Sequence, residues 1–166
     1  AIVKEVKVIH ANSLHLLQLI NDIVDLSKIE SGKSVLSNSE VRPSITIERC
    51  ISTFTGSANL RGAELLLDMD PNLFFYYCSG DEYRIEQVIN NLLSNAIKFS
   101  NGKPVTLEVE SNTNSNNILT LSCSVIDQGI GMSNALVATL GEKFTQADNT
   151  VSKDNGGTGL GLSITT

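Results

Sequence analysis

Apolar residues recur every three or four positions over residues 1–30, as they do on one face of a helix. The row runs through Val6, Ile9, Ser13, Leu16, Ile20 and Ile23. Additional leucine and valine residues widen this apolar surface beyond a two-helix seam. We therefore expect a long helix that is buried on more than one side, as in a helical bundle.

The pattern of the remaining chain switches between helical and alternating spacing. The expected elements are an extended stretch over 34–41, a helix over 44–60, strands over 64–69 and 74–78, a helix over 81–99, strands over 105–110 and 118–126, and a short helix over 134–140. Residues 141–157 show no clear periodicity and predict a mobile loop, and a further helix is expected from Gly159.

The helix over 81–99 carries two distinct rows of side chains. The apolar row is Ile85, Val88, Ile89, Leu92 and Ala96, and the polar row is Arg84, Gln87, Asn91, Asn95 and Lys98. Asparagine is a poor helix former, so a solvated face would more naturally use Glu or Lys. An amide oxygen suits a magnesium ion that shares its ligands with phosphate. The spacing alone favours neither a solvated face nor a magnesium site.

Composition narrows the function classes. The chain has 166 residues, of which 41% are hydrophobic, so about one globular domain is expected. A formal net charge of −6 argues against nucleic acid or an anionic membrane as the main partner. No apolar run reaches the ~18 residues of a membrane span, and no signal peptide opens the chain. Three widely spaced cysteines, Cys50, Cys78 and Cys123, predict buried, reduced thiols in a cytosolic domain.

Two glycine-containing segments are candidates for close approach to a ligand. Asp127-Gln-Gly-Ile-Gly131 follows an expected strand, and it fits either a turn that ends the strand or backbone that approaches a flat ligand. Gly156-Gly-Thr-Gly-Leu-Gly161 precedes an expected helix, whose first amides can receive phosphate oxygens. No Gly-Lys-Ser/Thr ends it, so it is not a Walker loop, and no strand leads into it as in a dinucleotide fold.

Taken together, these segments resemble the conserved boxes of the ATP-binding domain of sensor histidine kinases. The stretch from Arg84 to Phe99 is similar to the N box, 125–132 to the G1 box, 143–148 to the F box and 155–163 to the G2 box. Residues 14–32 resemble the second helix of that family's dimerisation and phosphoacceptor domain. The resemblance implies an α+β fold of the Bergerat type, a two-layer α/β sandwich with helices on one face of a mixed sheet, preceded by a long bundle helix.

The resemblance also implies ATP and Mg²⁺ as ligands and assigns roles by position. Asn95 is expected to bind magnesium, and Asn91 to support the metal or the phosphates. Lys98 is expected to neutralise phosphate charge, and Asp127 to accept the adenine amino group. The expected nucleotide contacts further include Gly129, Gly131, Phe144 in the lid, Gly157, Thr158, Gly159, Leu160 and Gly161.

The implied organisation has three parts. Residues 1–30 are the second helix of the helical hairpin without its first helix, 31–43 a linker with a short strand, and 44–166 a catalytic domain truncated at its C-terminal end. The implied activity is transfer of the ATP γ-phosphoryl group to a histidine outside this fragment, followed by relay to a response-regulator receiver domain. The resemblance further implies a homodimer through the N-terminal helix and no nucleic-acid partner. It also implies a cytoplasmic location, with any membrane anchor outside this chain.

Departures from the family pattern keep two alternatives open. The acceptor pattern of a histidine followed by an acidic residue is absent at His10 and His15, so self-phosphorylation of this chain is not expected. Asp154 and Asn155 replace a basic and aromatic pair in the lid. Gyrase-like and MutL-like ATPases share the fold but use a glutamate where this chain has Asn91, which cannot act as a general base. The second alternative is a non-catalytic module that senses nucleotide.

Overall fold

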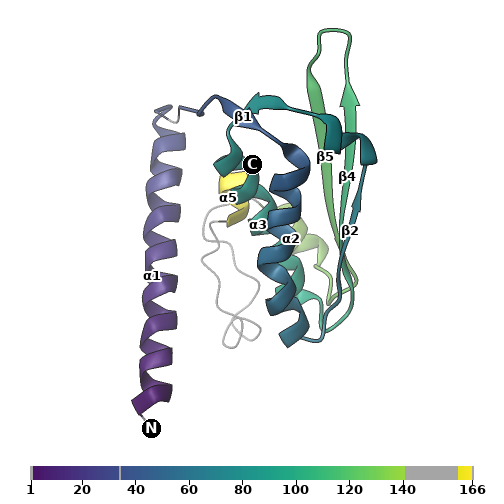
Figure 1. Ribbon diagram of the computed structural model, residues 1–166. Coiled ribbons are helices and arrows are strands. Elements are labelled where there is room, and N and C mark those ends of the chain that lie inside the picture. Colours follow the sequence, from purple (N-terminus) through teal and green to yellow (C-terminus); the bar gives the residue numbers. More distant parts are fainter. Residues whose placement is uncertain (1, 34, 141–160, 166) are drawn as a thin grey trace. The chain divides into compact units, whose positions relative to one another are not determined.

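The computed structural model describes residues 2–33, 35–140 and 161–165, and the chain divides into two units. The first unit comprises residues 1–35 and 135–166, with helix α1 (Ile2–Glu30) and the short helix α5 (Gly161–Thr165). The second unit comprises residues 36–134 and holds the sheet (Figure 1). Helix α4 (Asn134–Ala138) begins at the boundary. Each unit is described by itself.

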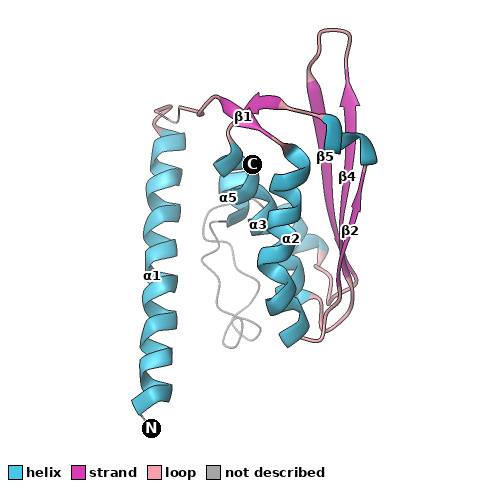
Figure 2. Ribbon diagram, in the orientation of Figure 1, coloured by secondary structure: helices cyan, strands magenta, loops and turns pink. Residues whose placement is uncertain are grey.

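The second unit combines helices with a mixed sheet (Figure 2). Its elements are β1 (Ser39–Val41), α2 (Pro43–Leu60), β2 (Leu65–Met69), the 3-10 helix η1 (Pro71–Phe75), β3 (Cys78–Gly80), α3 (Glu82–Phe99), β4 (Val105–Thr113) and β5 (Leu119–Asp127). The sheet order is β2-β4-β5, with β2 parallel to β4 and β4 antiparallel to β5. Strands β1 and β3 form a separate antiparallel pair.

Helices α2 and α3 cover one face of the three-stranded sheet, and the core lies between these two layers (Figure 1). The core joins Ile47 and Cys50 of α2, Leu73 of η1, Ile89 and Leu93 of α3, and Leu107 and Val109 of β4. Alternate residues of β4 are buried because successive side chains of a strand point to opposite faces. This architecture confirms the predicted α+β sandwich.

The predicted strand over 74–78 is wrong. The carboxylate of Asp70 accepts a hydrogen bond from the backbone N–H of Asn72 (2.9 Å), and Pro71 supplies a fixed φ at the first helical position. These two features start the 3-10 helix η1, which continues to Phe75. The strand therefore begins later, at Cys78, where it pairs with Val41 of β1.

The apolar row of α3 is rotated relative to its prediction. Ile89 and Ala96 are buried as expected, but Leu93 and Ile97 are buried with them, whereas Val88 is 36% exposed. At ~100° per residue, this shift places the buried side roughly opposite Asn91, Asn95 and Lys98. The polar row of α3 is therefore set more directly away from the core than the sequence pattern indicated.

Helix α1 forms as predicted and carries a row of exposed apolar side chains. Ile9, Leu16, Ile20 and Ile23 are each at least half exposed. Packing of this row in a bundle stays a prediction. None of the described helices is long and apolar enough to cross a membrane.

Candidate functional site

The polar row of α3 is presented by a helix whose start is firmly defined. Asp81 is the N-cap residue, and its carboxylate accepts a hydrogen bond from the N–H of Arg84 (3.1 Å). Asn91, Asn95 and Lys98 follow on one side of the helix, and all three are half-buried. Because residues four apart on a helix are neighbours, Asn91 and Asn95 present two adjacent amide groups.

Lys98 lies at the C-terminal end of this row, with its Nζ atom 4.7 Å from the centre of the Phe99 ring. Burial lowers the pKa of Lys98, and the positive charge of Arg61 lowers it further. Among the described residues, no salt bridge to Lys98 or Arg61 is found, whereas Arg49 pairs with Glu82 and Glu86. A partly desolvated cation beside a second cation favours the binding of an anion.

The loop after β5 is closed by Asp127, the last residue of that strand. Its Oδ1 atom accepts a hydrogen bond from the N–H of Gly129 (2.8 Å), which folds the backbone into a tight turn. Within the described residues, Oδ2 makes no hydrogen bond, and the residue is exposed. Gly131 then adopts a φ of 68°, in the left-handed region that favours glycine. The Oδ1 atom of Asp127 thus stabilises the turn of its own loop, and the Oδ2 atom is available to accept a hydrogen bond from a ligand.

Gly129 joins this loop to the end of α3. A Cβ atom at this position would lie 2.0 Å from the carbonyl oxygen of Phe99, so only glycine fits without displacement of the backbone. The next residue, Ile130, donates its N–H to the same oxygen at 3.2 Å. The contact holds the Asp127 loop beside the C-terminal end of the helix that carries Asn91, Asn95 and Lys98. The predicted carboxylate therefore lies near the same end of α3 as Lys98, on the helix that also carries the two asparagines.

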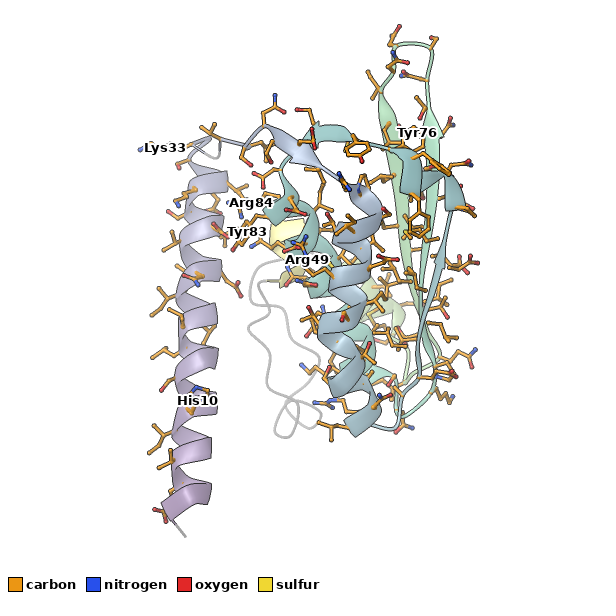
Figure 3. The ribbon with its side chains drawn as sticks, in the orientation of Figure 1. His10, Lys33, Arg49, Tyr76, Tyr83 and Arg84 are labelled. Atoms are coloured by element: carbon orange, nitrogen blue, oxygen red, sulfur yellow. The ribbon has the colours of Figure 1, made fainter. Side chains whose placement is uncertain are left out.

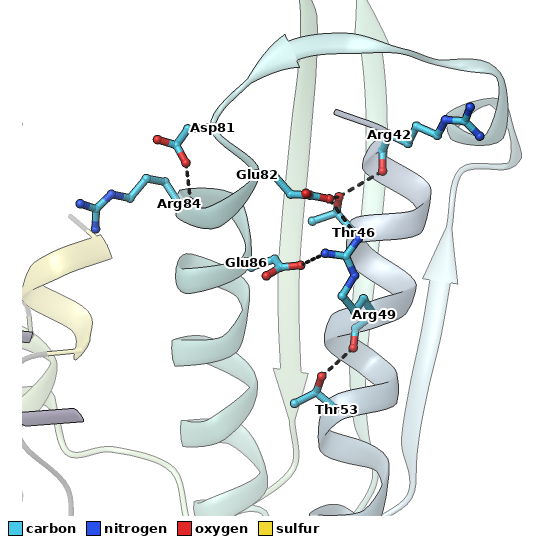
Figure 4. A network of polar contacts seen from close by, with 8 residues as sticks. All are labelled: Arg42, Thr46, Arg49, Thr53, Asp81, Glu82, Arg84 and Glu86. Atoms are coloured by element: carbon cyan, nitrogen blue, oxygen red, sulfur yellow. Dashed lines mark hydrogen bonds and ion pairs between the residues drawn. The ribbon is translucent and has the colours of Figure 1, made fainter. Parts of the chain in front are cut away.

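The first turns of α3 are also tied to α2 (Figure 4). Arg49 donates to Glu86 Oε1 (2.7 Å) and to Glu82 Oε1 (3.1 Å), and the hydroxyl of Thr46 donates to the same Glu82 oxygen (2.8 Å). Arg49 reaches across from the middle of α2 (Figure 3). Its side chain is half exposed, and exposed ion pairs contribute about 0–1 kcal/mol each. These bonds orient α3 and stabilise it only modestly.

The residue set fits a magnesium-bound nucleoside triphosphate. Lys98 and Arg61 supply positive charge for phosphate, the two asparagines supply amide oxygens, and Asp127 supplies an exposed acceptor. Gly129 brings bare backbone to the site. Among the described residues, no cluster of three or more His, Cys, Asp or Glu side chains is suited to a metal. Magnesium here would be held by amide oxygens together with the phosphates and water.

The other predicted contacts are not part of the described site. Five predicted contacts and the predicted loop over 141–157 lie outside the described residues. The five contacts are Phe144, Gly157, Thr158, Gly159 and Leu160. Gly161 begins α5 in the first unit. His10 is an exposed residue of α1 (Figure 3).

The cysteines are free thiols, as predicted, but only Cys50 is buried, whereas Cys78 and Cys123 are half-buried on strands β3 and β5. Burial raises the pKa of Cys50 to about 11, so that thiol is protonated and unreactive at neutral pH. Burial also raises the pKa of Cys78 and of Cys123.

Two features of the site cannot be predicted from local sequence patterns. Arg61 follows the end of α2, and its charge acts on Lys98, 37 residues later in the chain. The contact between Gly129 and Phe99 joins residues 30 positions apart, and no local pattern indicates it. Gly129 does not have a positive φ, so its own backbone conformation does not require glycine. The requirement arises from the carbonyl of Phe99, and it becomes visible only when that neighbouring backbone is placed.

Comparison with known proteins gives three related findings. Residues 80–166 match the family described as histidine kinase-, DNA gyrase B-, and HSP90-like ATPase. The chain is 35% identical over 161 residues to the signal transduction histidine-protein kinase BarA of Escherichia coli K12, and 37% identical over 163 residues to the circadian input-output histidine kinase CikA of Synechococcus elongatus. These matches cover 95% and 96% of this chain but only 17% and 21% of the two relatives. The structure of full-length ShkA in complex with AMPPNP is similar with a TM-score of 0.71 at 27% identity, covering 90% of this chain and 29% of ShkA.

Proposed function

The chain belongs to the family of histidine kinase-, DNA gyrase B- and HSP90-like ATPases, and from this premise we propose that it is the ATP-binding catalytic portion of a two-component sensor histidine kinase. The contact between Gly129 and Phe99 carries the proposal, because it joins the loop of Asp127 to the end of the helix on which Asn91, Asn95 and Lys98 lie. The full-length ShkA structure, which holds the ATP analogue AMPPNP, supports the choice of nucleotide.

Each described site residue has a role in this proposal. The free oxygen of Asp127 accepts the adenine amino group, and Asn95, with Asn91 beside it, provides amide oxygens for the metal. Lys98, supported by Arg61, neutralises charge on the phosphates. Bound magnesium supplies further neutralisation of the triphosphate. Positioning and charge neutralisation account for most of the catalysis in phosphoryl transfer.

We further propose that Gly131, Phe144, Gly157, Thr158, Gly159, Leu160 and Gly161 complete the nucleotide contacts. The γ-phosphoryl group is transferred to a histidine nitrogen outside these 166 residues: the bond to the bridging oxygen breaks, a phosphorus–nitrogen bond forms, and ADP leaves. The phosphoryl group then passes to a receiver domain of a response regulator. The proposed parts are a dimerisation helix over 1–30, a linker over 31–43 and the catalytic domain over 44–166. The first part mediates dimerisation, and any membrane anchor belongs to segments outside this chain.

Hydrolysis of ATP is the less favoured activity. A general base must accept a proton from water, and the amide of Asn91 cannot do so at neutral pH. Asn91 occupies the half-buried row of α3 at the position one turn before Asn95. Transfer to an external nucleophile needs no such base at this position. A release of phosphate at rates comparable to transfer would support the hydrolytic alternative instead.

The test is a competition titration with Mg-ATP and Mg-GTP. Guanine presents an acceptor where adenine has its amino group, so GTP should bind about tenfold to a few hundredfold more weakly. Asp127→Asn keeps an oxygen for the N–H of Gly129 but replaces the exposed acceptor with a donor. We expect this variant to bind ATP more weakly and to narrow the gap to GTP.

Two further variants separate the roles. Asn95→Ala should remove the dependence on magnesium and leave the base preference largely unchanged. Asp68→Asn removes the same charge as Asp127→Asn from an exposed position on β2 and should leave both affinities unchanged. If Asp127→Asn binds ATP as tightly as the parent, Asp127 is only a turn residue and the adenine assignment is wrong.

A further inference from the structure

The segment that precedes α2 is attached to the start of α3. Strand β1 pairs with β3, so Ser39 lies opposite Gly80 and Val41 opposite Cys78. The hydroxyl of Ser39 also donates to the carbonyl of Gly80 at 3.2 Å. This ladder ends one residue before the N-cap of α3. The segment over 37–41 therefore lies directly beside the point where α3 begins.

Asp81 connects the segment to the helix through two different oxygen atoms. Oδ1 accepts from the N–H of Arg84 (3.1 Å), which caps α3, and Oδ2 accepts from the N–H of Ser37 (2.9 Å), 44 residues earlier in the chain. Hydrogen bonds to a carboxylate are stronger than those between neutral groups. One side chain thus fixes the helix start and the incoming segment to the same point.

The opposite end of α3 is held by the site loop. Phe99 accepts the N–H of Ile130 (3.2 Å) and lies against Gly129. With a rise of 1.5 Å per residue, Asn91 is about 15 Å from the Asp81 end and Lys98 about 25 Å from it. If α3 tilts as a rigid rod about its Phe99 end, a displacement at Asp81 moves Asn91 and Asn95 more than Lys98 or the Asp127 loop.

The remaining attachments of the helix start do not replace this contact. The ion pairs of Arg49 with Glu82 and Glu86 join α3 to α2, but the Arg49 side chain is 51% exposed. Such pairs contribute about 0–1 kcal/mol each and are weakened by salt. The hydroxyl of Thr46 also donates to Glu82 from α2 (2.8 Å), and the β1–β3 pairing ends at Gly80. The bond between Asp81 and Ser37 is the contact that reaches the N-cap residue itself from the segment before α2.

We propose that Asp81 is a positioning residue for nucleotide binding: its contact with the N–H of Ser37 holds α3 in the orientation in which Asn91 and Asn95 face the same ligand as the Asp127 loop. The inference rests on the proposed ATP site. It predicts that loss of the contact weakens ligands that span the site and spares ligands that touch only the base end.

The experiment compares Mg-ATP with adenosine in the full chain. Asp81→Asn retains an N-cap residue but offers one acceptor oxygen instead of two. Ser37→Pro retains the carboxylate and removes the N–H donor. Each variant should bind Mg-ATP about three- to tenfold more weakly, a loss comparable to the net contribution of one ordinary hydrogen bond, with adenosine affinity unchanged. The double variant should be no weaker than either single variant, because both remove the same bond.

Matched controls account for charge and chain stiffness. Asp68→Asn removes a carboxylate from the sheet, and Val35→Pro adds a proline at a side chain that is 89% exposed. Both should bind as the parent does, and circular dichroism confirms that every variant is folded at the titration temperature. Unchanged Mg-ATP affinity in both test variants, or an equal loss for Mg-ATP and adenosine, overturns the inference. A parent chain that binds neither ligand refutes the proposed ATP site itself.

Discussion

Gly129 shows how one residue can decide whether two elements meet. The Cβ atom of any other amino acid would overlap the carbonyl of Phe99 at 2.0 Å. The neighbouring atom is backbone at the end of a helix, so it cannot move aside as the tip of a flexible side chain can. The absence of a side chain at Gly129 therefore allows the Asp127 loop to reach α3.

Gly129→Ala should separate the loop from α3. Overpacking of this kind costs about 1–3 kcal/mol, and we expect a lower free energy of unfolding together with weaker binding of Mg-ATP. Urea unfolding and nucleotide titration measure the two effects.

The matched control is Gly56→Ala in α2, where no atom lies within 4 Å of the added Cβ. Alanine is the better helix former, so this variant should be stabilised by up to about 1 kcal/mol and should bind normally. Equal behaviour of the two alanine variants would contradict the role of Gly129.

Single residues were predictable where the sequence pattern was local. The row of Asn91, Asn95 and Lys98 follows from helical spacing, and the turn at Asp127 follows from its glycines. The position of Arg61 beside Lys98 and the bond from Ser37 to Asp81 depend on chain segments 37 and 44 residues apart. Local patterns carry no information on such distances.

At the scale of elements, the carboxylates of two aspartates join separate segments through hydrogen bonds. Asp81 joins α3 to the segment before α2, and Asp70 begins η1 while accepting the hydroxyl of Ser111 on β4. The hydrogen bond from Ser37 is the largest cause of the lowered pKa of Asp81, and that from Ser111 is the largest cause for Asp70. Both carboxylates are therefore favoured in their charged form by the fold.

These lowered pKa values predict acid sensitivity. A group whose pKa is lower in the folded state stabilises the fold above its unfolded pKa, about 4 for Asp, and this contribution is lost as pH falls through the folded pKa. Asp81→Asn and Asp70→Asn should therefore be less stable than the parent at pH 7. The difference should shrink below pH ~4, where the parent carboxylates become protonated. Urea midpoints at pH 7 and pH 3 measure it, and a difference that is constant with pH would contradict the assignment.

Most elements were predicted correctly, and the errors have a common cause. Helices α1, α2 and α3 and the β4–β5 hairpin follow from periodicity. The prediction of a strand over 74–78 was wrong because a run of aromatic residues is typical of an extended chain. Asp70 and Pro71 instead start a 3-10 helix just before it. The buried side of α3 was predicted incorrectly because Val88 and Leu93 are equally apolar. Only the positions of α2 and the sheet decide which of the two is buried.

At the scale of the whole molecule, helix α1 presents an apolar surface in the first unit. Leu16, Ile20 and Ile23 are 58%, 50% and 51% exposed. Exposed apolar rows of this length favour association. The surface matches the proposed dimerisation through residues 1–30.

We expect the chain to form dimers or larger species whose population rises with concentration. Replacement of Leu16, Ile20 and Ile23 by glutamine should shift it to monomers, because the apolar area that drives association is removed. Val35→Gln is the control, since Val35 is 89% exposed and lies outside α1. Sedimentation velocity measures the species. A parent that stays monomeric while its α1 amides are protected from hydrogen exchange would count against a role in dimerisation.

The parallel pairing of β2 with β4 has a consequence for how the protein acquires its activity. Parallel neighbours need a long return connection, and here that connection contains α3 with its polar row. The strands cannot find their register until the connection has folded back across the sheet, so loop closure and placement of the site residues are one kinetic step. We therefore expect nucleotide affinity to appear only when the sheet register has formed. A ligand that binds only the native state should then raise the free energy of unfolding.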